Sequence, residues 1–262
     1  MDLHFKCTQC GRCCHDTRVP LTVEEAIRWL ERGHEVQLLC EASPWPQAAD
    51  DDLTAAHFKR RSFAVMSGSM PARVVVMLVA NVVGACPNLL PDMRCGIYDE
   101  RPGVCRIYPA EINPSVILRP ENKACPPEAW TPDQPVLQRH GAVLNERIRQ
   151  DIRLSRDADA HDADIKRRAC GALNIADAAL VHEAMLVYSP TAKSLARALA
   201  AAQAGSFQES PTHWRFVSTR FETTAALARS GGTSIDLCDT VAASFQHLAF
   251  QRHALFGPYI RE

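Results

Sequence analysis

The chain has 262 residues, of which 47% are hydrophobic and 23% are charged, a composition typical of a soluble globular protein with one large domain or two small ones. A formal net charge of −1 gives no electrostatic reason to expect nucleic acid or an anionic membrane as a partner. The first six residues do not resemble a secretory signal, and the longest apolar stretch, 74–83, is too short to cross a bilayer as a helix. We therefore expect a cytoplasmic protein whose thiols stay reduced, with a protein or small molecule of unknown identity as its partner.

Four cysteines lie close together near the start of the chain, at Cys7, Cys10, Cys13 and Cys14. A Cys-x2-Cys pair lets two thiolates reach one metal ion from a tight turn, and Gly11 leaves room where the backbone curls around that ion. On a following helix Cys7, Cys10 and Cys14 would share one face and Cys13 would lie beside it, so the four need not serve one metal. Because the chain has 11 cysteines, an odd number, a disulfide framework is disfavoured. Metal binding is favoured over a redox dithiol.

The next segments have clear local signals. Thr22 is a good N-cap, Glu25 stands at the capping-box position and Gly33 ends the pattern, which predicts a short helix at about 23–32. Residues 72–79 are rich in β-branched side chains and predict a buried strand.

A second set of cysteines follows that strand: Cys86, Cys95, Cys105 and Cys125. Three of these four are next to proline or glycine, which shape the backbone in tight loops. Loops of this kind need an anchor, and a bound metal would supply one because structural metal sites contribute folding free energy directly.

Two motifs carry a resemblance to a known family. Phe5-Lys6-Cys7-x2-Cys10-Gly11-x-Cys13-Cys14, together with the segment Cys-x-Ile-Tyr-x-x-Arg-Pro-x-x-Cys-Arg-x-Tyr-Pro at 95–109, resembles a bacterial cysteine-cluster family described as zinc- or iron-chelating. The resemblance covers about residues 5–127 and implies metal chelation without settling the metal. The flagellin lysine N-methylases are more distantly similar, with a wider spacing in their first cysteine cluster.

Placed on this sequence, the family motif implies eight thiolate ligands: Cys7, Cys10, Cys13, Cys14, Cys86, Cys95, Cys105 and Cys125. Eight thiolates permit two closed four-thiolate zinc sites, or one 4Fe-4S cluster held by four of them with the others structural or serving a second centre. Zinc modules usually contain paired Cys-x2-Cys knuckles, and only the first half of this set has that form. We therefore favour an iron-sulfur cluster, with zinc as the alternative.

Several polar side chains flank the expected ligands. Arg101, Arg106, Tyr98 and Tyr108 could offset the negative charge of a thiolate site and tune a cluster, or could instead make ordinary salt bridges and packing contacts. His15, next to Cys14, is the histidine best placed to join the thiolates as a ligand. Of the other cysteines, Cys40 and Cys238 are expected to be packed, and Cys170 has no partner signal.

The composition changes near residue 132, because 14 of the 17 prolines and nine of the 11 cysteines lie before Val136. We expect a cysteine-cluster metal-binding region at 1–132 and an α-helical region at 133–262. The fold class expected is mainly α, with a loop-rich N-terminal region containing a short strand pair, packed on a C-terminal helical body. Helices are expected at about 137–152, 178–188, 191–204, 211–228 and 233–256.

Three functions fit these patterns. The first is an iron-sulfur protein, with a 4Fe-4S cluster that supports redox or enzyme chemistry. The second is a zinc protein whose thiolate sites hold together an interaction module. The third, from the distant resemblance, is an S-adenosylmethionine-dependent protein lysine methyltransferase. The chain has no dinucleotide-binding, Walker or serine-hydrolase motif, so whether it is an enzyme is open.

Overall fold

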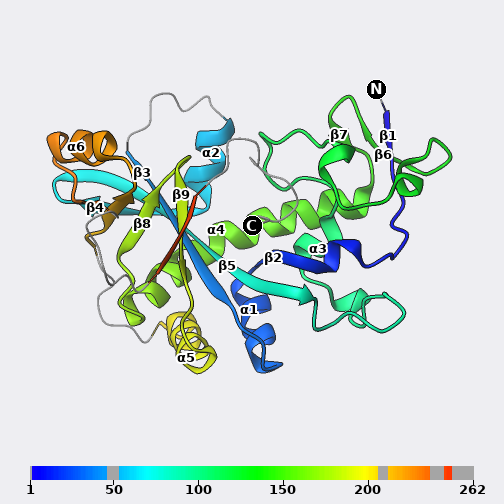
Figure 1. Ribbon diagram of the computed structural model, residues 1–262, viewed down its shortest axis with the longest axis horizontal. Helices are drawn as coiled ribbons and strands as arrows, with labels where there is room; N and C mark the ends of the chain where they lie inside the picture. Colours follow the sequence, from blue (N-terminus) through cyan, green and yellow to red (C-terminus); the bar gives the residue numbers. More distant parts are fainter. Residues whose placement is uncertain (1, 46–52, 206–211, 237–244, 250–262) are drawn as a thin grey trace.

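The computed structural model describes residues 2–45, 53–205, 212–236 and 245–249 (Figure 1). In these residues nine strands form one mixed sheet and three more form a small antiparallel sheet. The large sheet contains β2 (His15–Leu21), β3 (Gln37–Pro44), β4 (Ser62–Ser67), β5 (Met70–Ala85), β8 (Asp177–Leu180), β9 (Ala184–Tyr188), β10 (Arg215–Ser218), β11 (Ser234–Asp236) and β12 (Gln246–Ala249), and the small sheet contains β1 (Asp2–His4), β6 (Val136–Arg139) and β7 (Ala142–Val143). The helices are α1 (Val23–Glu31), α2 (Leu53–Arg60), α3 (Gly103–Ile107), α4 (Glu146–Ala172), α5 (Ala192–Gln203) and α6 (Phe221–Arg229).

The expectation of a mainly α fold is therefore wrong, and the largest error lies at 178–188. That segment forms β8 and β9, and all five residues of β9 are buried. A strand covered on both faces has a nearly continuous apolar sequence, which lacks the alternation that distinguishes strands from helices. The expected helices at 137–152 and 211–228 also begin with strands, β6 and β10, before α4 and α6. Within 233–256 the described residues contain β11 and β12, and the other positions, Cys238 among them, lie outside the described residues.

Other local predictions are confirmed. Thr22 and Glu25 form the expected capping box at the start of α1, α5 covers the helix expected at 191–204, and the strand expected at 72–79 lies inside β5.

The large sheet has the order β11-β10-β8-β3-β5-β2. The strands β8, β10 and β11 are parallel to one another, and β3 pairs in parallel with β8 but antiparallel with β5. Strands from both sides of residue 132 belong to this sheet, and the division of the chain at that residue stays a prediction. None of the described helices has both the length and the apolar character needed to cross a membrane.

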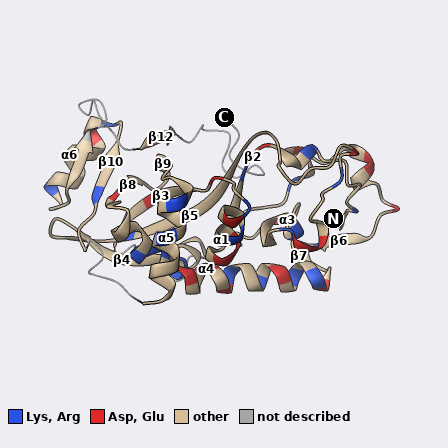
Figure 2. Cartoon of the chain, turned by 90° about the horizontal axis from the view of Figure 1, so that it is seen from below, with Lys and Arg blue, Asp and Glu red and all other residues tan. Residues whose placement is uncertain are grey.

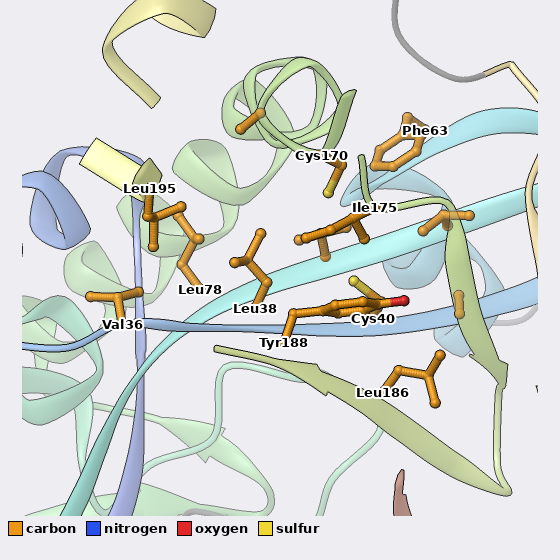
Figure 3. Packing of buried hydrophobic residues seen from close by; sticks show 14 of the residues in the cluster. Val36, Leu38, Cys40, Phe63, Leu78, Cys170, Ile175, Leu186, Tyr188 and Leu195 are labelled. Carbon is orange, nitrogen blue, oxygen red and sulfur yellow. The ribbon is translucent and has the colours of Figure 1, made fainter. Parts of the chain in front are cut away.

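The main hydrophobic core lies between this sheet and the helices α1, α4 and α5. Figure 3 shows Leu38 and Cys40 of β3 and Leu78 of β5 facing Cys170 of α4 and Leu195 of α5. All five side chains are fully buried. Cys40 is therefore a core residue, as predicted, and the chemistry of Cys170 is likewise that of a small buried hydrophobe.

The 27-residue helix α4 connects the sheet with the cysteine-rich part of the chain. Its N-cap is Asn145, whose side chain accepts a hydrogen bond from the Ile148 N–H. Acidic and basic residues alternate along the outer face of α4 (Figure 2), where they form ion pairs one turn apart, such as Arg167 with Asp164. In Figure 1, β2, β5 and α4 all run from the main sheet toward α3 and the cysteine-bearing loops.

A candidate metal centre at the end of the sheet

Cys14 and Cys86 are placed by the same pair of strands. Cys14 directly precedes β2 and Cys86 directly follows β5, and these antiparallel strands pair His15 with Ala85. The Cys86 N–H donates to the Cys14 carbonyl oxygen at 2.7 Å, which extends the ladder by one bond beyond the strands. Cys14 and Cys86, 72 positions apart, are therefore held side by side by backbone hydrogen bonding, independently of any metal.

Gly11 allows the loop that contains Cys7 to Cys14 to pack against the loop from Cys86 to Cys95. Its φ is +69°, and a Cβ atom placed there would lie 2.9 Å from the Met93 carbonyl oxygen and 3.2 Å from Leu89 Cδ1. The Gly11 carbonyl accepts from the Cys14 N–H at 2.9 Å and lies 3.1 Å from His15 Nδ1. His15 thus contributes a hydrogen bond to this turn. Only glycine fits both the backbone conformation and the close approach.

Cys95 is held by the loop that follows β5. Cys95 forms an isolated antiparallel bridge with Leu89, and the Gly96 N–H donates to the Asn88 carbonyl at 2.7 Å. The loop from Cys86 to Cys95 therefore folds back on itself, which returns Cys95 to the neighbourhood of the strand end.

Cys105 lies on α3, which is anchored to two other helices. One oxygen of the Glu25 carboxylate caps α1, and the other accepts a hydrogen bond from the Gly103 N–H at 2.7 Å. Arg106 Nε donates to Asp151 Oδ1 of α4 at 3.1 Å. Cys105 itself packs against the main hydrophobic core. Its position is set by contacts that do not involve the other cysteines.

Four cysteines from separate segments lie around this end of the sheet, and we refer to Cys14, Cys86, Cys95 and Cys105 as the inner thiol group. Burial raises the pKa of Cys105, and the charges of Cys14, Cys86 and Cys95 raise it further. Burial also raises the pKa of Cys86, to which Cys14 and Cys95 again add. The pKa of Cys14 is raised first by its contact with the Cys13 thiol and then by burial. Other thiols of this group thus disfavour the thiolate forms of Cys86 and Cys105, and a cation bound beside these two residues would favour those forms.

The other four predicted ligands are Cys7, Cys10, Cys13 and Cys125, and we refer to them as the outer thiol group. Burial raises the pKa of Cys125 to about 11, with further contributions from Cys7 and Cys10. The Tyr108 hydroxyl lies against the Cys125 thiol and lowers this pKa. Burial and then the charge of Cys125, with a smaller contribution from Cys13, raise the pKa of Tyr108. Cys7 is exposed and the other three are partly buried.

Arg101 supplies positive charge to the inner thiol group. It lowers the pKa of both Cys14 and Cys105 against the stronger effects that raise them. The guanidinium lies 3.6 Å from the centre of the Tyr98 ring, and Arg101 Nε donates to the Tyr98 carbonyl at 2.8 Å. The cation-π contact and the hydrogen bond to Tyr98 hold the Arg101 guanidinium in place, and neither interaction requires a bound metal.

Arg106 and Tyr108 have structural partners. In addition to its ion pair with Asp151, Arg106 donates from Nη1 to the Arg101 carbonyl at 2.5 Å. The Tyr108 hydroxyl accepts from the Ala124 N–H at 2.7 Å. The roles of Arg101, Arg106, Tyr98 and Tyr108 toward a metal stay predictions, but the Arg101 charge lowers the pKa of Cys14 and Cys105 and the Tyr108 hydroxyl lowers the pKa of Cys125.

Three contacts were not foreseen in the sequence. The Gln9 N–H donates to Cys7 Sγ at 3.4 Å. Hydrogen bonds from the backbone and side chain of Asn88 lower the pKa of Cys86 and so favour its thiolate. Lys123 likewise lowers the pKa of Cys125. Gln9 and Asn88 both lie two residues after a cysteine, where N–H groups commonly turn toward a sulfur, and this offset is the signal that could have identified them.

The donor chemistry of both groups fits a thiophilic metal, because thiolates bind zinc and iron-sulfur clusters. In the described part of the chain, however, no three His, Cys, Asp or Glu side chains are close enough together to be ligands of one metal ion. Zinc-sulfur bonds are about 2.3 Å long, which brings the four sulfurs of a zinc site within about 4 Å of one another. A single ion would therefore require the thiols of either group to move inward.

Residues 6–126 match a family model, CxxCxxCC, with the description "Putative zinc- or iron-chelating domain". All eight cysteines of the two thiol groups lie within this match. No curated protein and no solved structure matches the chain.

Proposed function

Because residues 6–126 match the CxxCxxCC family model, which is described as a zinc- or iron-chelating domain, we propose that this protein carries a 4Fe-4S cluster on its inner thiol group. Bound there, such a cluster would supply one-electron redox chemistry or the reactive centre of an enzyme. The ligands would be Cys14, Cys86, Cys95 and Cys105.

The observation that carries the proposal is how firmly the backbone fixes the position of each ligand. Cys14 and Cys86 stand at paired strand ends, and Cys105 stands on a helix that is hydrogen-bonded to α1 and α4. Moving these thiols onto one ion would disturb the ladder or the helix contacts. In a 4Fe-4S cluster each thiolate binds a different iron, so the four sulfurs can remain farther apart than around one zinc ion. Separate, rigidly placed cysteines therefore suit a cluster better than a mononuclear site.

The surroundings of the group also suit a cluster. Four thiolates leave a net negative charge, which the Arg101 guanidinium offsets for Cys14 and Cys105. Cys86 and Cys105 pack against the main hydrophobic core. An apolar environment shields a cluster from solvent and oxidants, and the Asn88 contact with Cys86 adds the kind of hydrogen bond that tunes a cluster potential.

Elemental analysis and visible absorption of protein purified without oxygen test this proposal. We expect about four irons with matching sulfide per chain, and broad sulfur-to-iron charge-transfer bands. The double variant C95S/C105S should lose the iron and the colour, whereas C40A, which changes a cysteine in the core, should retain both. Colourless anaerobic wild-type protein with zinc and without iron would overturn the proposal and favour the zinc alternative.

A further inference from the structure

The hydroxyl of Thr17 is buried on β2 without a hydrogen-bond partner. The residue is 5% exposed, and among the described residues none forms a hydrogen bond with its Oγ1 atom. A buried hydroxyl that stays unpaired costs free energy, and native proteins pair nearly all such groups. Valine has almost the same shape and would fit a strand without this cost. The hydroxyl therefore indicates a partner that is bound separately.

Thr17 faces the same side of the sheet as the main hydrophobic core. The register of β2 against β5 is regular from Thr17 to Leu21. Side chains two positions apart along a strand share one face, so Thr17 lies on the face of Val19 and Leu21, and both of these belong to the core. Of the three, Thr17 lies nearest the start of β2, and Cys14 directly precedes that strand.

The inner thiol group lies on this side of β2 as well. Cys86 and Cys105 both pack against the core to which Val19 and Leu21 belong. Cys105 is on α3, which packs against β2. The buried hydroxyl of Thr17 is thus placed between the core and the inner thiol group, in surroundings that are otherwise apolar.

A cluster bound at the inner thiol group would supply the missing acceptor. The sulfurs of an iron-sulfur cluster carry negative charge and accept hydrogen bonds, and these bonds are one of the factors that set its reduction potential. A hydrogen bond to a charged acceptor is also stronger than one between neutral groups. The hydroxyl would keep its proton and act only as a donor.

We propose that the Thr17 hydroxyl donates a hydrogen bond to a sulfur of the centre bound at the inner thiol group, which strengthens retention of that centre and favours its reduced form. This inference rests on the proposed function for the identity of the centre. Reduction adds negative charge to the sulfurs, so the hydrogen bond becomes stronger in the reduced state. Loss of the hydroxyl should therefore shift the reduction potential to more negative values.

Two pairs of variants isolate the hydroxyl. T17V replaces it by a methyl group at nearly constant volume, and T17A compared with T17S removes it from a smaller side chain. We expect T17V to have a more negative reduction potential than wild-type protein, and T17A a more negative one than T17S. T17V and T17A should also release metal to a chelator about tenfold more readily than those two references.

T224V is the matched control. Thr224 is also buried, but its Oγ1 donates to the Phe221 carbonyl oxygen at 2.9 Å. It lies on α6, at the opposite end of the molecule from α3 (Figure 1). T224V should lower the urea midpoint and leave the reduction potential and the release of metal unchanged.

The outcomes separate this inference from the proposed function. Iron-containing protein in which T17V has the wild-type potential, or in which T17A and T17S have equal potentials, would overturn the role of Thr17 and leave the cluster proposal intact. A water molecule that accepts the hydrogen bond in place of a sulfur would give this same result. Wild-type protein with zinc and without iron would overturn the cluster proposal. The release of zinc would then decide the role of Thr17, which stands if T17V and T17A lose zinc more readily than their references and fails if they do not.

Discussion

Replacement of Gly11 by alanine tests whether the two cysteine loops must pack together to hold metal. Gly11 has a φ of +69°, and its Cα faces the second loop so closely that a Cβ atom would lie 2.9 Å from the Met93 carbonyl oxygen. We expect G11A to separate the segment containing Cys7 to Cys14 from the segment containing Cys86 to Cys95, and thereby to weaken metal retention.

The expected loss of metal affinity in G11A is the sum of two free-energy costs. Alanine in the left-handed conformation costs about 1 kcal/mol relative to glycine. Relief of the contact with a backbone carbonyl, which cannot rotate away as a side chain can, costs a further 1 to 3 kcal/mol, about the range for overpacking a tight site. The total of about 2 to 4 kcal/mol corresponds to metal binding weakened by about 30-fold to several hundred-fold.

Gly33 provides the matched control. Its φ is +83°, but a Cβ atom there would meet nothing within 4 Å. G33A therefore carries the conformational cost without the clash. The assay is competitive removal of metal by a chelator, with unfolding in urea measured in parallel. If G11A and G33A lose metal equally readily, the loop-to-loop contact does not hold the site, and the reasoning fails.

Three further predictions concern side chains around the site and beyond it. Y108F removes the acceptor of the Ala124 N–H and should lower the free energy of unfolding in urea by about 1 to 2 kcal/mol; an unchanged value would contradict this. R106A leaves the largely buried Asp151 carboxylate unpaired and should cost about 1 to 3 kcal/mol in the same assay, with R106K recovering part of the loss. Burial lowers the pKa of His57 from 6.5 to about 4. Protonation of His57 is therefore less favourable in the folded state than in the unfolded state. The contribution of neutral His57 to the free energy of unfolding should be fully present above about pH 6.5. It should fall by about 1 to 2 kcal/mol as the pH approaches 4, after discounting for solvent screening. H57Q should flatten this dependence, and an identical pH profile in the variant would refute the assignment.

Local signals in the sequence were sufficient to predict an element where residues within that element determine its structure. The capping box of Thr22 and Glu25 predicted α1, and the β-branched run predicted the buried part of β5. Both signals depend on neighbours within a few residues, so both could be recognised from the sequence alone.

The mixed sheet could not be predicted in the same way. β8 and β9 are buried in part because β3 pairs with both of them, and β3 lies more than 130 positions away in the sequence. Their apolar spacing is compatible with a helix when read alone. The decision is made by tertiary pairing, which overrides a weak local preference.

The types of residue at the site were likewise visible, whereas their grouping was not. Cysteine spacing indicated ligands, but the position of Cys14 beside Cys86 depends on where β2 begins. The position of Cys105 depends on Glu25, which caps one helix and binds the N–H of Gly103 in the next. Neither the start of β2 nor the hydrogen bond from Gly103 to Glu25 can be inferred from the spacing of the cysteines.

The register of β2 against β5 links the hydrophobic core to the inner thiol group. Asp16 interrupts the ladder between His15 and Thr17, with a φ of +44°, and its carboxylate accepts from the Gly84 N–H at 2.7 Å. A slip of one residue would turn the core side chains of β2 toward the opposite face and would move Cys14 away from Cys86. Because the core opposes such a slip strongly, the protein does not depend on a metal to bring these two thiols together.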